Sequence, residues 1–172
     1  GSGKTTLAES MLLAGGVISR KGDVDQKTTA SDFREIEQEN QRSVYSSVLY
    51  TEYNDKKVNI LDAPGADDFI GSVVSSLRVS DVALMVINSQ NGVEVGTEIH
   101  QRYTEKYNTP VVYVVNKCDH DHANFEKSLE SLKERFGSKV AQLQFPVNAG
   151  PAFDSIVDVL QMKLYKFPKG GG

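Results

Sequence analysis

Two uninterrupted apolar runs, at residues 82–87 and 111–115, constrain the fold of this chain more than any other feature. A run that is apolar at every position is typical of a strand with both faces buried, as in parallel sheets. Residues 95–107, between the two runs, can form a helix. Because parallel strands need a crossover of about a dozen residues or more, the order strand, helix, strand predicts an α/β fold.

The rest of the chain continues the alternation of strands and helices. Residues 54–57 are turn-like and separate an alternating segment rich in Val and Tyr, 44–53, from a second short strand, 58–61, which predicts an antiparallel hairpin. The segment 19–42 is polar and aperiodic, and a segment of that length is more often functional than a simple connector. We therefore expect a P-loop α/β fold with a doubly wound, mostly parallel sheet and one antiparallel edge hairpin, which binds ligands at the carboxyl ends of its strands. The expected strands are 44–53, 58–61, 82–87, 111–115 and 140–147, and the expected helices are 4–14, 71–78, 95–107, 125–136 and 153–164.

Length and composition narrow the class of protein. The chain has 172 residues and suits one domain, 1–172, with enough residues for a substantial core. It contains no apolar stretch of the ~20 residues that a transmembrane helix needs, so no membrane partner is expected. Its single cysteine excludes an internal disulfide and fits a cytoplasmic protein. A net charge of −4 without a dense basic stripe indicates no direct sequence-specific nucleic-acid binding by this chain.

The first residues match the end of a phosphate-binding loop, G-x-x-x-x-G-K-[ST]. In that motif, backbone N–H groups and a helix N-terminus hold phosphate oxygens. Lys4 is expected to reach the β- and γ-phosphates, and the Thr5 hydroxyl is expected to bind Mg²⁺. The motif's first glycine would precede residue 1, so we expect a chain that begins inside its phosphate loop. The alternative is a Gly-Ser remnant before an ordinary helix. The candidate phosphate-binding residues are Ser2, Gly3, Lys4, Thr5 and Thr6.

Asp62 and Gly65 belong to a second motif, Asp-Ala-Pro-Gly, which follows an apolar strand about sixty residues after the phosphate loop. A carboxylate there is expected to hold a metal ion through water. Gly65 leaves its backbone N–H free to approach a γ-phosphate. The alternative, a strand followed by an ordinary turn, does not account for the order of the motifs.

The tetrad Asn116-Lys117-Cys118-Asp119 follows the second apolar run and predicts specificity for guanine. The Asp119 carboxylate can accept hydrogen bonds from both the ring N1–H and the exocyclic amine of guanine, a pair that adenine does not offer. Lys117 is expected to cover the base with its stem, and Asn116 is expected to tie the loops together. The three motifs together predict GTP or GDP and Mg²⁺ as ligands. A P-loop kinase or ATPase is a weaker alternative, because neither needs this tetrad.

These motifs resemble the G domain of elongation factor G, and the resemblance extends from residue 1 to about residue 166. It is closer to a divergent elongation-factor-G-like branch than to the housekeeping protein, and the tetracycline-resistance ribosomal protection proteins are less similar. The family's fifth guanine-binding motif would come after this chain, so we expect a G-domain fragment. The resemblance implies a cytoplasmic translation factor whose partner is the ribosome and whose role is translocation. The residues that carry it are 3–9, 37–39, 62–65, 68–69 and 116–119.

Two departures from the family pattern concern the switch regions, expected at about 19–43 and 62–72. Where the family has Arg-Gly-Ile-Thr, residues 40–43 are Asn-Gln-Arg-Ser, and Ser43 keeps a hydroxyl for the metal ion. Where the family has a histidine that positions the attacking water, this chain has Ala66. Losing a general acid–base group typically costs about 10²–10⁴-fold in rate. No catalytic residue is therefore assigned, and we expect GTP binding with slow or absent hydrolysis. The alternatives are a fully active ribosome-stimulated GTPase and a ribosomal protection or recycling factor.

Overall fold

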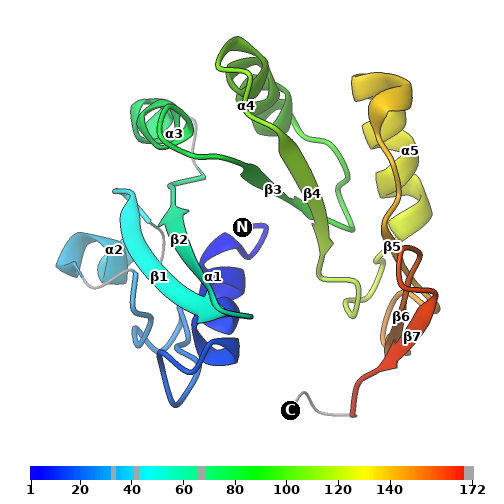
Figure 1. Ribbon diagram of the computed structural model, residues 1–172, viewed down its shortest axis with the longest axis horizontal. Coiled ribbons are helices and arrows are strands. Elements are labelled where there is room, and N and C mark those ends of the chain that lie inside the picture. The colour runs from blue at the N-terminus through cyan, green and yellow to red at the C-terminus, as the bar shows by residue number, and fades with distance from the viewer. Residues whose placement is uncertain (32–33, 41–42, 66–68, 169–172) are drawn as a thin grey trace. The chain divides into compact units, whose positions relative to one another are not determined.

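The computed structural model describes residues 1–31, 34–40, 43–65 and 69–168 (Figure 1). These residues divide into two compact units. The first contains Gly1, the described part of Gly3–Leu84, and Ile99–Val112, and the second contains Ser2, Met85–Glu98 and the described residues from 113 onward. Each unit is described by itself below.

The antiparallel hairpin predicted from the sequence is present in the first unit. Strand β1 (Ser47–Tyr53) pairs with β2 (Lys56–Asp62) in a register that places Ser47 opposite Asp62. The two residues between the strands, Asn54 and Asp55, have φ angles of 48° and 58°. Two successive positive φ angles are typical of the type I′ turn, whose twist matches that of a hairpin. This turn explains why the strands begin and end within a few residues of their expected bounds.

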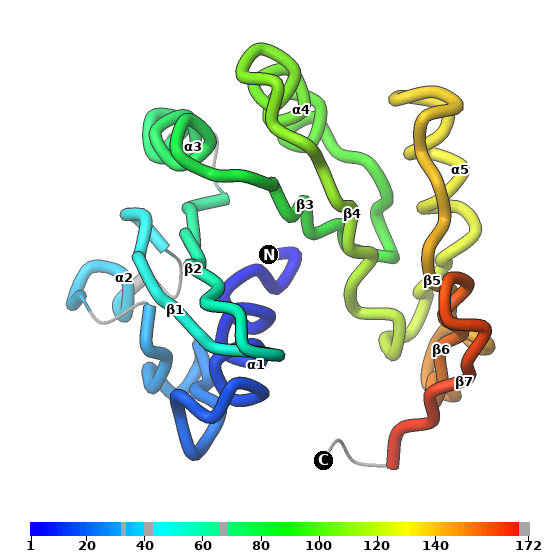
Figure 2. The backbone as a smooth tube through the Cα atoms, in the orientation of Figure 1, coloured from blue at the N-terminus to red at the C-terminus, as the bar shows by residue number. Residues whose placement is uncertain are grey.

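Helix α1 (Lys4–Ala14) lies along the β1–β2 hairpin (Figure 2). Its side chains Ala8 and Leu12, one turn apart, are buried and form part of the core of this unit. The helix ends at Gly15, where a Cβ atom would collide with the Thr51 side chain of β1. Glycine therefore allows the close approach of helix and strand.

Two helices follow α1 in the described part of the first unit that precedes Ala83: α2 (Glu35–Asn40) and α3 (Ile70–Leu77). Helix α3 was predicted, with bounds that differ by one residue. Helix α2 was not, because the sequence from 19 to 42 shows no periodicity. Its first turn carries Glu35 and Glu37, where negative charge stabilises a helix N-terminus. Glu37 is only 1% exposed, and its Oε1 accepts hydrogen bonds from the backbone N–H groups of Val44 and Tyr45 at 3.0 Å each. This local tertiary contact is not visible in a hydrophobic pattern.

The parallel pair predicted from the two apolar runs is also present. Strand β3 (Ala83–Asn88) is followed by α4 (Val95–Lys106) and β4 (Val111–Asn116), and β3 is hydrogen-bonded to β4. Ala83 N–H donates to the Pro110 carbonyl and Ser89 N–H to the Asn116 carbonyl, so the two strands run in the same direction. Burial is less complete than expected, because Ile87 is 2% exposed but Leu84 is 45% exposed. Among the described strands, β3 pairs with β4 alone.

Helix α5 (Phe125–Phe136) belongs to the second unit and has the predicted bounds. Asn124 caps it, since the Asn124 side chain accepts a hydrogen bond from Lys127 N–H at 2.9 Å. Leu132 is 2% exposed, and the Phe136 ring stacks on Tyr113 of β4 with ring centroids 5.5 Å apart. A short 3-10 helix, Gly137–Lys139, follows it.

The helix predicted at 153–164 is wrong. The chain instead forms β6 (Ser155–Asp158) and β7 (Lys163–Lys166), an antiparallel pair that β5 (Gln144–Pro146) completes as a three-stranded sheet. The apolar residues that suggested a helix meet across the hairpin, where Val157 lies opposite Leu164. The Asp158 carboxylate accepts a hydrogen bond from Gln161 N–H at 2.8 Å, and Met162 has a φ of 54°, which a continuing helix does not allow.

The hydrogen bonds of Asp158 also stabilise its ionised form. Gln161 N–H, and next the Gln144 side-chain amide at 3.1 Å, hold the pKa of Asp158 below its ordinary value.

The strand expected at 140–147 is shorter in the structure, since only Gln144–Pro146 pairs with β6. No helix within the described ranges is both long and apolar enough to cross a bilayer.

Candidate nucleotide-binding site

Three oxygen-bearing side chains from separate parts of the first unit meet near the start of α1. The Thr5 hydroxyl donates a hydrogen bond to Asp62 Oδ2 at 2.8 Å, and Thr5 Oγ1 lies 3.3 Å from Ser43 Oγ. Asp62 ends β2 and is only 6% exposed, while Ser43 precedes β1. The structure therefore brings together the three residues that the sequence assigns to the metal side of the site. Hydroxyl and carboxylate oxygens are the ligands that Mg²⁺ takes, so this donor set fits the ion.

Lys4 and Gly65 are also neighbours in the first unit. A Cβ atom built on Gly65 would collide with the Lys4 ammonium group. Gly3, which precedes α1, has a φ of 89°, a conformation that favours glycine. The absence of a side chain at Gly65 thus leaves room for the lysine head and for any anion that it binds. Ala66, the residue at the family's histidine position, lies outside the described residues.

The base-specificity tetrad lies at the end of β4 in the second unit. Asn116 is the last residue of β4, and its side-chain amide donates a hydrogen bond to the Ser2 carbonyl at 2.9 Å. Ser2 belongs to the same unit as Asn116, and the expected role of Asn116 in tying the loops together stays a prediction. Lys117 has a φ of 61°, so the chain turns sharply there, and Asp119 is exposed. The contacts of Lys117 and Asp119 with a base stay predictions.

Two residues that hold the tetrad were missed by sequence reasoning. Ser89, which follows β3 and is 0% exposed, donates its hydroxyl to the Lys117 carbonyl at 2.8 Å. Gly150 N–H donates to the Cys118 carbonyl at 2.7 Å. Gly150 has a φ of 90°, which favours glycine. The signal available in the sequence for Ser89 was a small polar residue soon after an apolar run, whereas the contact of Gly150 has no local signature.

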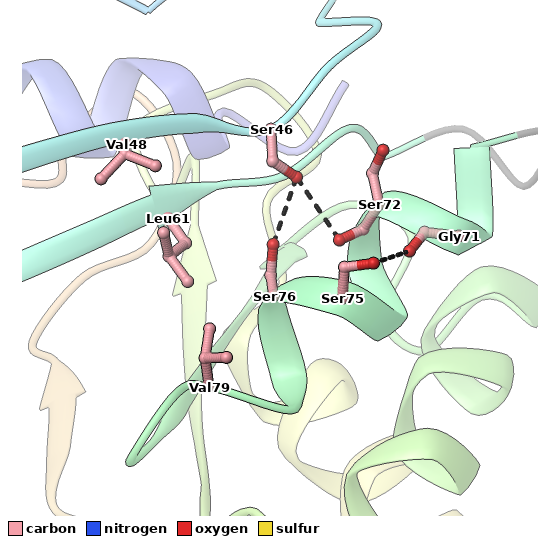
Figure 3. A pocket seen from close by; sticks show the side chains of 8 residues that line it. All are labelled: Ser46, Val48, Leu61, Gly71, Ser72, Ser75, Ser76 and Val79. Atoms are coloured by element: carbon pink, nitrogen blue, oxygen red, sulfur yellow. Dashed lines mark hydrogen bonds between the residues drawn. The ribbon is translucent and has the colours of Figure 1, made fainter.

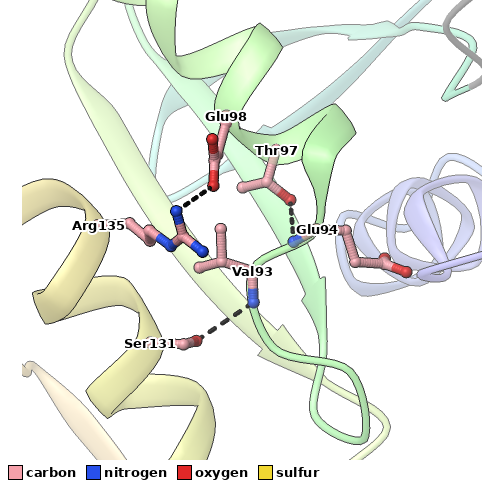
Figure 4. A network of polar contacts seen from close by, with 6 residues as sticks. All are labelled: Val93, Glu94, Thr97, Glu98, Ser131 and Arg135. Carbon is pink, nitrogen blue, oxygen red and sulfur yellow. Dashed lines mark hydrogen bonds and ion pairs between the residues drawn. The ribbon is translucent and has the colours of Figure 1, made fainter.

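The segment after β3 is fastened to α5 within the second unit (Figure 4). Val93 N–H donates to Ser131 Oγ at 3.2 Å, and the Arg135 guanidinium forms an ion pair with Glu98 at 3.1 Å. Arg135 is 58% exposed, so the ion pair contributes little free energy. These bonds hold the segment that follows Ser89, the residue whose hydroxyl holds the tetrad.

Cys118 occupies the variable position of the tetrad and has an unreactive thiol. Burial, and next the negative charges of Asp119 and Glu126, raise its pKa to about 11. At pH 8 its thiolate fraction is therefore about 100-fold below that of an ordinary cysteine, and the thiolate is the reactive form. We expect iodoacetamide to alkylate Cys118 at least ~100-fold more slowly in the native protein than in urea. Peptide mass spectrometry over a time course measures both rates, and equal rates would contradict the burial of this thiol.

A cavity of about 330 Å³ lies elsewhere in the first unit, between the β1–β2 hairpin and α3 (Figure 3). Its wall includes Ser46, whose hydroxyl donates to the Ser72 carbonyl at 3.4 Å and lies 3.2 Å from Ser76 Oγ. None of the predicted nucleotide-binding residues lines it. A second, more polar pocket of about 340 Å³ is lined by Thr6 and residues 20–26. Of these two pockets, only the second includes a predicted nucleotide-binding residue.

The fold and the order of these sites define the class of protein: a G domain of the P-loop type, as found in translational GTPases. Residues 1–167 match the model of the elongation factor Tu GTP binding domain. The chain belongs to this family. The resemblance to elongation factor G expected from the sequence is confirmed by the relatives described next.

The chain is similar to an elongation factor G-like protein of Mycobacterium tuberculosis, with 38% identity over 170 residues. It is 36% identical to elongation factor G of Mycoplasma pneumoniae over 169 residues. These alignments cover 99% and 98% of this chain but only 23% and 25% of the relatives. A crystal structure of a protein from Thermus thermophilus superimposes with a TM-score of 0.92 at 32% identity, covering 99% of this chain and 26% of that one. The chain thus spans about a quarter of the length of each of these three proteins.

Proposed function

We propose that this chain is the guanine-nucleotide-binding part of a longer, elongation-factor-G-like translation factor. It binds GTP and GDP together with Mg²⁺, and the intact protein acts on the ribosome in translocation, in the cytoplasm. The observation that carries the proposal is the meeting of Thr5, Ser43 and Asp62. Ser43 and Asp62 lie 38 and 57 positions after Thr5 in the sequence, and an ordinary turn after an ordinary helix gives no reason for them to meet.

The phosphate side of the proposed site follows from local chemistry. The N-terminus of a helix favours a bound anion, and at the start of α1 Lys4 adds a positive charge beside Gly65. Thr5, and with it Ser43 and Asp62, would hold Mg²⁺, directly or through water. When bound, the ion neutralises phosphate charge.

The base side of the proposed site depends on Asp119. An exposed carboxylate on a loop fastened by Ser89, Gly150 and Asn116 is well suited to accept two parallel hydrogen bonds from a purine. Fastening the loop in advance lowers the entropy cost of binding. This supports guanine over adenine as the preferred base.

We further propose that hydrolysis of GTP is slow, because Ala66 cannot position a water molecule or carry a proton. The switches, at about 19–43 and 62–72, would then respond chiefly to binding and release of nucleotide. The same nucleotide site would also suit two other members of this class. One is an active GTPase that the ribosome stimulates, and the other is a ribosomal protection or recycling factor.

A competition experiment tests nucleotide binding by the intact protein. Fluorescent GDP is bound in Mg²⁺ and then displaced by unlabelled nucleotides. We expect GTP and GDP to displace it at similar concentrations. ATP should require a concentration at least ~100-fold higher, because adenine does not offer the pair of hydrogen bonds that Asp119 accepts from guanine. Chelation of Mg²⁺ by EDTA should speed release of the labelled nucleotide, because the ion screens phosphate charge. Equal displacement by ATP and GTP would overturn the guanine assignment, and release that EDTA leaves unchanged would overturn the metal site.

A further inference from the structure

Ser89 is buried directly after β3 and connects two parts of the second unit. It is 0% exposed, and its N–H, hydroxyl and carbonyl all form hydrogen bonds. The N–H donates to the Asn116 carbonyl at 3.0 Å, and the hydroxyl donates to the Lys117 carbonyl at 2.8 Å. The Ser89 carbonyl accepts hydrogen bonds from Asn124 N–H and from the Ser128 hydroxyl, at 3.1 Å each. One serine therefore joins the base-specificity tetrad to the start of α5.

The two hydrogen bonds that Ser89 donates lie on either side of one backbone position. The carbonyls of Asn116 and Lys117 belong to the two peptide groups that flank the Cα atom of Lys117. Because peptide groups are planar, the orientations of these two groups set φ and ψ of Lys117. Its φ is 61°, a left-handed conformation that is sparsely populated by residues other than glycine. Such a conformation persists where the surrounding structure holds it, and here both donors come from Ser89.

The same backbone position opens the turn that contains Asp119. The Lys117 carbonyl also accepts a hydrogen bond from His120 N–H at 3.2 Å, which closes the four-residue turn 117–120. The carbonyl of the next residue, Cys118, is held by Gly150 N–H at 2.7 Å. Asp119 is thus the third residue of a turn whose first two carbonyls are held from outside the turn. The backbone that carries the Asp119 carboxylate is therefore set by these anchors.

We propose that Ser89 is a positioning residue for guanine recognition. By holding the peptide groups on both sides of Lys117, it places the Asp119 carboxylate for two simultaneous hydrogen bonds to the base. The inference rests on the proposed function, because it takes Asp119 as the residue that recognises guanine. Two parallel hydrogen bonds require one orientation of the carboxylate, whereas a single bond tolerates more movement. Loss of the anchor should therefore weaken the bidentate contact more than a single hydrogen bond.

The variant Ser89→Ala tests this role, because it removes the hydroxyl and leaves the backbone groups of residue 89 in place. Displacement of fluorescent GDP from the intact protein measures the affinities of GDP and of inosine diphosphate. Inosine diphosphate keeps the ring N1–H but lacks the exocyclic amine, so it makes only one of the two bonds to Asp119. We expect GDP affinity to fall about 3- to 10-fold, as for loss of one hydrogen bond. The preference for GDP over inosine diphosphate should fall at least ~2-fold.

Three outcomes would contradict the inference, and they have different meanings. Equal losses of affinity for GDP and inosine diphosphate would mean that Ser89 only supports the loop. Unchanged affinities would mean that the hydroxyl does not position the tetrad. If the unaltered protein binds GDP no more tightly than inosine diphosphate, the proposed base recognition is wrong and the inference fails with it. In the first two cases the unaltered protein still prefers GDP, so the proposed function stands.

Ser128→Ala is the matched control. Ser128 is 1% exposed, and its hydroxyl donates to the carbonyls of Ser89 and Asn124, at 3.1 and 2.9 Å, and not to the tetrad. Without it, the Ser89 carbonyl keeps the hydrogen bond from Asn124 N–H. Each variant loses one buried hydroxyl, so a similar loss of thermal stability is expected. Only Ser89→Ala should change the preference for GDP, and an equal change in both variants would overturn the positioning role.

Hydrogen–deuterium exchange provides a second measurement that needs no variant. The Gly150 amide is buried and donates to the Cys118 carbonyl, so its exchange reports whether the turn is fixed. In the intact protein without nucleotide, we expect this amide to exchange at least ~100-fold more slowly than in an unfolded peptide. Exchange at the unfolded rate would show that the turn is not set before the base binds, and would overturn the inference.

Discussion

Replacing Asp119 with asparagine is expected to lower GTP affinity by roughly 10²–10⁴-fold and to create a preference for xanthosine triphosphate. The carboxylate accepts two hydrogen bonds from guanine, and each bond to a charged group contributes about 1.5–3 kcal/mol. Asparagine offers one acceptor and one donor group, which suits xanthine, because xanthine has a carbonyl where guanine has an amine. Equilibrium displacement of fluorescent GDP from the intact protein measures both affinities.

The control for this substitution is Asp121→Asn, two residues further along the same loop and exposed. It changes the net charge of the loop by the same amount but should leave nucleotide preference within about twofold, as expected for screened surface charge. If Asp119→Asn leaves nucleotide choice unchanged, the base-specificity assignment is wrong, and with it the proposed function. If both substitutions weaken GTP equally, the effect is electrostatic and not base recognition.

The second large effect is expected in the rate of GTP hydrolysis. With ribosomes present, the intact protein should hydrolyse GTP about 10²–10⁴-fold more slowly than an elongation factor whose switch II carries histidine, since Ala66 provides no general acid–base group. The variant Ala66→His should recover much of this difference while nucleotide affinity stays within a few-fold. Single-turnover hydrolysis with limiting GTP, measured with and without ribosomes, separates the chemical step from nucleotide release.

Two outcomes would redirect this interpretation. A ribosome-stimulated rate equal to that of an ordinary elongation factor would falsify the proposal of slow hydrolysis and favour a fully active GTPase. A histidine variant that binds nucleotide but gains no rate would place the defect in the loop around Ser43, where the family pattern also changes. Ser43→Thr combined with Ala66→His tests that second case, because it restores the family's metal-side residue.

Much of the fold was predictable because its signals are local. The hairpin β1–β2 follows from a turn-like segment between an alternating run and a short second strand, and the β3–β4 pair follows from two apolar runs joined by a helix. Helix α5 has a clear 3.6-residue period and an asparagine cap. The candidate site residues were chosen from similar local signals: each motif follows a strand or opens a helix, and the chemistry of phosphate, metal ion and base restricts the residue types. Their contacts with a nucleotide stay predictions.

The misses involve contacts that a hydrophobic pattern does not report. The residues Ile156, Val157, Leu160 and Leu164 fit one face of a helix, but the same spacing places Val157 opposite Leu164 in a hairpin. What decides between the two is the turn at Asp158–Met162, stabilised by a side-chain hydrogen bond. Glu9 of α1, which is only 1% exposed, was overlooked because a glutamate on a helix is usually solvent-exposed. Its burial depends on backbone groups 13 and 21 residues away.

The hydrogen bond from Gly150 N–H to the Cys118 carbonyl makes positions 118 and 150 differ in the substitutions that they tolerate. Both partners are main-chain atoms, so the side chain at 118 does not enter this contact. We expect small apolar residues to replace the cysteine with the loss only of the hydrogen bond from its thiol to the Val115 carbonyl. Position 150 does not tolerate substitution in this way, because its left-handed backbone conformation is unfavourable for every residue that has a Cβ atom. A library of variants should therefore accept several residues at the variable position of the recognition motif and reject nearly all at a glycine that lies well outside it.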